Sequence, residues 1–99
     1  MDFKYKLHRK AFVDLDEAIA WYNQKGGKRL AAQFFTEYRK LRSKIVENPF
    51  QFGEVENGYR QAVFTKFPYT IIFSPSDLEV FVLAVFHTKR NPKDWKSRA

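Results

Sequence analysis

His87, Arg60 and Arg90 are the residues of this chain best suited to act on a phosphodiester. Cleavage of RNA without a metal needs a base for the 2′-hydroxyl proton, an acid for the leaving oxygen and cations around the phosphate. A histidine can carry protons near neutral pH, and the fork of an arginine can bind two phosphate oxygens. The three residues are therefore a candidate catalytic set, with His87 as the proton carrier and the arginines as phosphate ligands.

His87 and Arg60 also have structural explanations. His87 ends an apolar run, where its ring could close the edge of a sheet and hydrogen-bond the next segment. We prefer this explanation to the catalytic one. Arg60 could form an ion pair with Glu54 or Glu56 instead of binding phosphate, and its sequence context leaves both roles open.

Composition restricts the kinds of site that the chain can contain. Its 99 residues have the size of one domain, residues 1–99. Eleven Phe, five Tyr and two Trp supply a compact core and leave little room for an internal cofactor cavity. The absence of cysteine excludes disulfides, thiolate metal ligands and cysteine nucleophiles. We expect neither a cofactor nor a bound metal.

We expect neither a membrane span nor a secretion signal in this chain. Its apolar runs are all shorter than the roughly 20 residues that a membrane-spanning helix needs. The first residues alternate charged and apolar side chains, unlike the apolar region of a signal peptide. We therefore expect a cytoplasmic protein without a membrane partner.

The net charge of +7 is concentrated in two segments. Residues 28–48 contain six basic and two acidic side chains, and residues 88–99 contain five and one. Such clusters fit an anionic partner, either nucleic acid or an acidic protein surface. A merely solubilising surface explains the charge equally well.

The basic segment 88–99 is predicted to be a C-terminal tail that binds a partner. Its candidate contacts are Lys89, Lys93, Trp95 and Lys96, with the tryptophan as a possible aromatic anchor. Alternatively, Trp95 folds back to cover the sheet, while only the charges face a partner.

Hydrophobic periodicity predicts a strand followed by two helices. Residues 3–8 alternate apolar and polar side chains, which is typical of a half-buried strand. From residue 11 the apolar side chains Phe12, Leu15, Ile19 and Tyr22 follow a helical stripe that ends at Gly26 and Gly27. A second helix is predicted over residues 28–47, and Asn48-Pro49 ends it. The short connection predicts an antiparallel helical hairpin.

Three strands are predicted in the remainder of the chain. Residues 50–58 are predicted to form a loop, and strands are expected over 59–65, 67–74 and 79–87, with a turn at 75–77. The order βααβββ predicts an α+β fold with a three-stranded antiparallel meander. The last strand is apolar on both faces, so we expect a central position in a sheet covered on both sides. The hairpin would cover one face, and a bound partner is one candidate for the other.

Several segments resemble the RelE/ParE superfamily of type II toxin–antitoxin modules, and the resemblance extends over nearly the whole chain. The matching segments are 58–60 (GYR), 67–73 (FPYTIIF), 85–92 (VFHTKRNP) and Trp95, with weaker support from 18–22 (AIAWY) and Asn48-Pro49. The resemblance implies a growth-inhibiting toxin that a cognate antitoxin neutralises. Members similar to RelE cleave messenger RNA at the ribosome, whereas those similar to ParE poison DNA gyrase. The resemblance also implies a role in plasmid stabilisation.

Pro68 is the main departure from the nuclease pattern. Ribosome-dependent nucleases of the superfamily usually have an arginine at this place that takes part in catalysis, whereas this chain has Phe67-Pro68-Tyr69. The missing cation favours a ParE-like inhibitor of gyrase, which would not be an enzyme. The alternatives are a RelE-like endoribonuclease that uses Arg60, His87 and Arg90, and an inactive member that only binds a partner.

Overall fold

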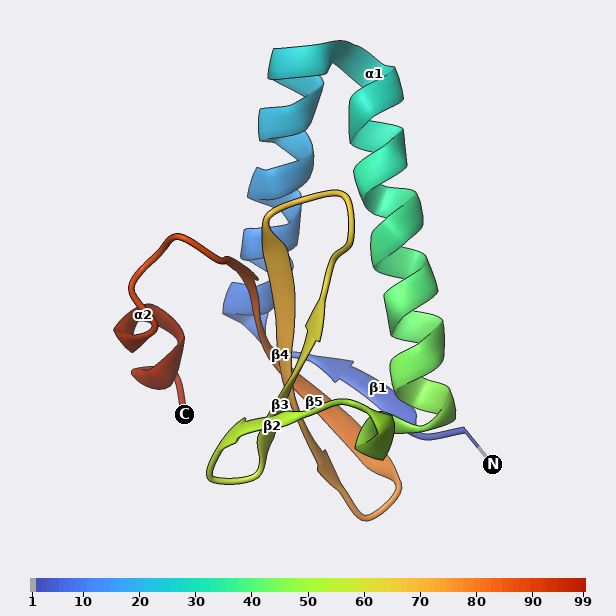
Figure 1. Ribbon diagram of the computed structural model, residues 1–99, viewed down its shortest axis with the longest axis vertical. Helices are drawn as coiled ribbons and strands as arrows, with labels where there is room; N and C mark the ends of the chain where they lie inside the picture. The colour runs from blue at the N-terminus through green and yellow to red at the C-terminus, as the bar shows by residue number, and fades with distance from the viewer. Residues whose placement is uncertain (1) are drawn as a thin grey trace.

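The computed structural model describes residues 2–99 and confirms an α+β fold. A helical hairpin packs against one face of a five-stranded sheet, and the chain ends in a short helix on the other face (Figure 1). In the described residues, no helix has the length and apolarity needed to span a membrane.

The hairpin is formed by α1 (Arg9–Glu47), which bends sharply at Gly27. The φ of 79° and ψ of −176° at this residue lie in a region that is almost exclusive to glycine. Two antiparallel arms result, residues 9–26 and 28–47, as the sequence predicted. His8 begins the helix, because its Nδ1 accepts a hydrogen bond from the backbone N–H of Lys10 at 3.0 Å.

The buried stripe of the first arm shares two of its four members with the predicted stripe, because Ala11 and Ala18 are buried in place of Phe12 and Ile19. Ala11, Leu15, Ala18 and Tyr22 are buried, whereas Phe12 is 60% exposed. Neighbouring residues on a helix point about 100° apart. Because Ala11 faces the core, Phe12 lies at the side of the helix and is largely exposed to solvent. The second arm buries Ala31, Phe34, Tyr38, Leu41 and Ile45.

The sheet has the strand order β1-β5-β4-β3-β2. Its strands are β1 (Lys4–Leu7), β2 (Glu54–Glu56), β3 (Tyr59–Val63), β4 (Tyr69–Ser76) and β5 (Glu79–His87). β1 pairs in parallel with β5, and the other neighbours are antiparallel. The prediction of a loop over residues 50–58 was wrong in part, because this segment contains a one-turn helix, η1 (Pro49–Gln51), and the edge strand β2.

The larger core lies between the hairpin and the sheet, and Phe34 is at its centre. Its ring stacks on Tyr22 at 5.2 Å and on Phe64 at 4.9 Å between centroids. Fully buried side chains of β4 and β5, among them Phe73 and Val82, complete this layer. Aromatic residues therefore supply much of the core volume, as the composition indicated.

The second face of the sheet is covered by residues 88–99. The helix α2 (Lys93–Lys96) places Trp95 against Ile72, Leu83 and Phe86 and next to Tyr59, and the tryptophan is only 5% exposed. A bound partner was one candidate for covering this face of the sheet. The structure shows that the chain's own C-terminal segment covers it instead. The segment is docked on the sheet and is not a free tail.

Candidate functional site

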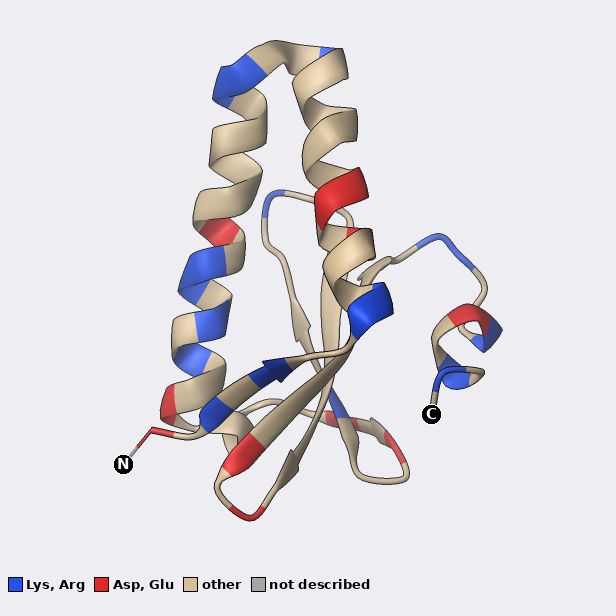
Figure 2. Ribbon diagram, turned by 180° about the vertical axis from the view of Figure 1, so that it is seen from behind, with Lys and Arg blue, Asp and Glu red and all other residues tan. Residues whose placement is uncertain are grey.

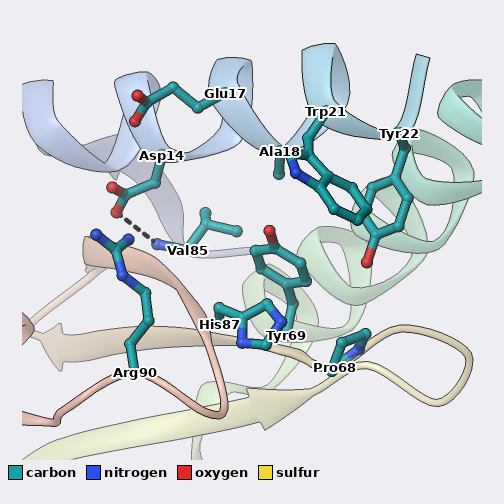
Figure 3. A pocket seen from close by; sticks show the side chains of 10 residues that line it. All are labelled: Asp14, Glu17, Ala18, Trp21, Tyr22, Pro68, Tyr69, Val85, His87 and Arg90. Carbon is teal, nitrogen blue, oxygen red and sulfur yellow. Dashed lines mark hydrogen bonds between the residues drawn. The ribbon is translucent and has the colours of Figure 1, made fainter. Parts of the chain in front are cut away.

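An open cleft of about 420 Å³ lies between the first arm of α1 and the adjoining ends of β4 and β5 (Figure 3). The residues that line it are Asp14, Glu17, Ala18, Trp21, Tyr22, Pro68, Tyr69, Val85, His87 and Arg90. Two of the three predicted catalytic residues, His87 and Arg90, thus share one cleft.

The end of β5 holds His87 in this cleft. His87 is paired with Tyr69 of β4, and the two rings meet edge to face at 5.1 Å. Its Nδ1 accepts a hydrogen bond from the backbone N–H of Lys89 at 3.1 Å, so the neutral ring carries its proton on Nε2. In this state His87 can donate a hydrogen bond through Nε2, but its one lone pair, on Nδ1, is already engaged by Lys89 and is not free to take a proton.

Arg90 reaches the cleft from the turn after β5. Its backbone N–H donates to the carbonyl of His87 at 3.0 Å, and its Nε lies 3.7 Å from the carboxylate of Asp94. In Figure 3 the guanidinium points toward Asp14. The Asp94 carboxylate therefore competes with a phosphate for this cation.

Asp14 joins the two ends of the chain. Its carboxylate accepts two hydrogen bonds from the guanidinium of Arg98 and a third, of 3.1 Å, from the backbone N–H of Val85. Arg98 also donates to the carbonyl of Leu83 at 3.2 Å. The side chains of Asp14 and Arg98 are only 8% and 12% exposed.

These contacts cover the part of β5 that β1 does not reach, since β1 pairs with β5 only as far as Val82. Sequence analysis missed this ion pair, because its partners are 84 positions apart and no local pattern connects them.

The aromatic wall of the cleft comes from α1 and β4. Burial raises the pKa of both Tyr22 and Tyr69, so their phenols stay protonated near neutral pH. Trp21 is 52% exposed, and the ammonium of Lys25 lies 5.3 Å from its ring centroid. These rings offer apolar contact area to a binding partner, while the phenols supply neither an acid nor a base near neutral pH.

Arg60 lies far from this cleft. It is paired with Phe73, four residues along β4 from Tyr69, the partner of His87. The separation is about 13 Å along the strands and about 10 Å across them. The Arg60 guanidinium donates to the carbonyl of Phe52 at 2.7 Å.

The same guanidinium lies over the Phe50 ring at 5.2 Å and 4.0 Å from the carboxylate of Glu54. These contacts match the structural explanation of Arg60, and the structure does not bring it together with His87 and Arg90.

The predicted partner-binding residues lie in very different environments. Lys89 and Lys93 are exposed, and Lys96 forms an ion pair with Glu56 at 2.8 Å. Trp95 lies in the second core and could anchor a partner only if the C-terminal segment detached from the sheet. Within the described part of the chain, no three metal-ligating side chains come together.

The arrangement in the cleft is suited to recognition rather than to phosphodiester cleavage. One imidazole and one arginine share the cleft with the Asp14 carboxylate, which Arg98 neutralises, and with the Glu17 carboxylate, which repels a phosphate. Pro68 occupies the position at which nucleases of the superfamily usually have an arginine. Its backbone carbonyl accepts a hydrogen bond from the N–H of Thr88 at 2.9 Å, and its side chain supplies no cation. The cations required around a reacting phosphate are therefore not gathered here.

Comparison with known proteins agrees with this fold. The family model described as "ParE toxin of type II toxin-antitoxin system, parDE" matches residues 5–92. A solved chain described as "Chromosomal ParDE TA system from P. aeruginosa" superimposes with a TM-score of 0.77 at 19% identity, covering 88% of this chain and 97% of that chain. No curated protein matches the sequence. The extent of the family match shows that the chain belongs to the ParE toxin family of type II toxin–antitoxin systems.

Proposed function

We propose that the chain inhibits DNA gyrase in the bacterial cytoplasm and is neutralised by a cognate antitoxin. The observation that carries this proposal is the dispersal of the residues that a nuclease would need. Arg60 is held by Phe52 at the far end of the sheet from His87. Membership of the ParE family, together with the resemblance to ParE-like members that poison DNA gyrase, supports gyrase as the target. The ParDE description of the structural neighbour supports an antitoxin partner.

The direct test is a supercoiling assay with purified gyrase and relaxed plasmid. The chain is expected to reduce supercoiling or to trap gyrase on cleaved DNA, while leaving messenger RNA intact in a ribosome assay. In a bacterial host without antitoxin, induction should activate the DNA damage response without transcript cleavage. Mapped messenger cleavage with unaffected gyrase would instead support the RelE-like alternative, and no effect in either assay would support an inactive member.

Variants in the cleft sharpen this test. A nuclease that uses His87 and Arg90 should lose RNA cleavage in His87→Ala and in Arg90→Ala. Lys6→Ala is the matched control for Arg90→Ala, because each removes one exposed cation of an ion pair, with Glu79 and Asp94 respectively. Circular dichroism and urea unfolding must show that each variant keeps its fold.

A further inference from the structure

A second surface, distinct from the cleft, lies along the second arm of α1. It has two hollows of about 450 and 280 Å³, which adjoin because Thr36 and Lys40 line both of them. Arg29 and Lys66 line the first hollow and Arg39 the second. We call this surface the basic groove and define it by its four cations, Arg29, Arg39, Lys40 and Lys66. Figure 2 shows much of the blue of the second arm gathered in its lower half.

The four cations of the basic groove are free, whereas those of the C-terminal segment are largely neutralised. Among the described residues, none of the four forms an ion pair with a carboxylate. In the C-terminal segment, by contrast, Arg90, Lys96 and Arg98 are each paired with an acid. Residues 28–48 and 88–99 have the same net positive charge in the sequence. In the folded residues 2–99, the cations that remain without an acidic partner lie mainly on α1.

Of the residues that the structure describes, Glu37 is the one acid that lines the basic groove, and its carboxylate accepts three hydrogen bonds from the neighbouring loop. Its carboxylate accepts hydrogen bonds from the hydroxyl and backbone N–H of Thr65 and from the N–H of Lys66, at 2.5–3.1 Å. Partial burial opposes these bonds, yet together they lower the pKa of Glu37. The loop between β3 and β4 is thereby held against α1, which brings Lys66 into the basic groove.

Three other lining residues have side chains that can donate hydrogen bonds to an anion. They supply the amide of Gln33 and the hydroxyls of Thr36 and Ser43, which are frequent phosphate contacts in nucleic-acid complexes. From residue 29 to residue 43 the helix rises about 21 Å. That length corresponds to about six nucleotides of one duplex strand at roughly 3.4 Å each.

We propose that the basic groove binds the phosphate backbone of duplex DNA. Proteins that bind single strands stack bases on aromatic side chains, and within residues 2–99 none of the lining residues is aromatic. Binding energy at protein interfaces is concentrated in desolvated central pockets that are rich in aromatic side chains, whereas Ala32 is the one apolar residue in the lining of the described groove. This inference goes beyond gyrase inhibition and does not depend on it, because its ligand is DNA alone.

The test measures binding of the whole chain to a labelled 20-base-pair duplex of mixed sequence by fluorescence anisotropy. If four phosphates are contacted, the slope of log K against log salt should be about −3.6. Affinity should then fall about 150-fold between 50 and 200 mM salt. A duplex of unrelated sequence should bind equally well, because phosphate contacts carry no sequence information.

The double variant Arg39→Gln/Lys40→Gln should weaken the slope to about −1.8. Its matched control, Arg9→Gln/Lys10→Gln, removes the same two types of exposed cation from the first arm of α1 and should leave the slope near −3.6. Glutamine retains helix propensity, and urea unfolding should show that both variants are folded.

Several results would overturn the proposal. They are an absence of duplex binding at 50 mM salt, equal losses in the two double variants, and tighter binding of a single strand or of polyglutamate than of the duplex. The gyrase assay with the same variants separates the two proposals. Gyrase inhibition that survives loss of DNA binding would leave the proposed function standing by itself. A wild-type chain that binds duplex DNA without inhibiting gyrase would leave only the DNA-binding proposal standing.

Discussion

The ion pair between Asp14 and Arg98 allows the sharpest test of how this fold is held together. In Arg98→Ala the Asp14 carboxylate remains almost buried and keeps only the Val85 N–H as a partner. Breaking a buried pair by removing one partner costs about 3–5 kcal/mol. We expect about 3 kcal/mol, the low end of that range, because the backbone donor remains.

Urea unfolding followed by circular dichroism measures this loss directly. The midpoint should shift at unchanged m-value, since the surface exposed on unfolding stays the same. In a domain of this size, a loss of about 3 kcal/mol lowers Tm by roughly 12–24 °C.

Lys96→Ala is the matched control in the same segment. Its ion pair with Glu56 has side chains that are 43% and 40% exposed, so the variant should lose about 0.5 kcal/mol or less. If Arg98→Ala costs no more than Lys96→Ala, the ion pair does not hold the C-terminal segment and the reasoning is wrong.

Three further predictions concern the hairpin and its contacts. Gly27→Ala should lower the free energy of unfolding by about 1–3 kcal/mol through backbone strain alone, because a Cβ at this position would have no atom within 4 Å. Gly53→Ala, whose added Cβ would be equally free of contacts, should cost much less in urea unfolding. Equal losses in the two variants would refute the role of strain. Phe34→Ala should cost about 3–5 kcal/mol by opening a cavity in the larger core, and a thermal melt within a few degrees of wild type would contradict this. Glu37→Gln should cost about 1 kcal/mol. Because the pKa of Glu37 is lowered from its ordinary 4.5, its stabilisation is complete above that value and is lost as pH falls through the lowered pKa. A pH titration of urea stability should therefore show a smaller loss of stability in acid for the variant, and identical profiles would contradict the role of Glu37.

Local patterns in the sequence were sufficient to predict most of the fold. The run over 79–87 predicted β5 with its observed bounds, because a strand buried on both faces must be apolar throughout. The glycine pair predicted the bend of the hairpin, since few other residues tolerate the backbone at Gly27. The short strand β2 escaped prediction because an exposed edge strand needs no apolar alternation.

The candidate site was only partly predictable. His87 and Arg90 are three residues apart at the end of one strand, so their proximity follows from the sequence. The separation of Arg60 from them depends on the register of β3, β4 and β5, which no local pattern specifies. The basic groove likewise needs the β3–β4 loop to carry Lys66 to α1.

By itself, the sequence determined the α+β order, the family and the two concentrations of positive charge, because each depends on residue types and short spacings. Only the tertiary structure decided which charges remain free. Folding pairs Arg98 with Asp14 across 84 positions and buries Trp95 against the sheet, while the cations of the basic groove stay in solvent. Ion pairs and burial depend on which elements pack together, and that information lies in the fold rather than in any segment of the chain.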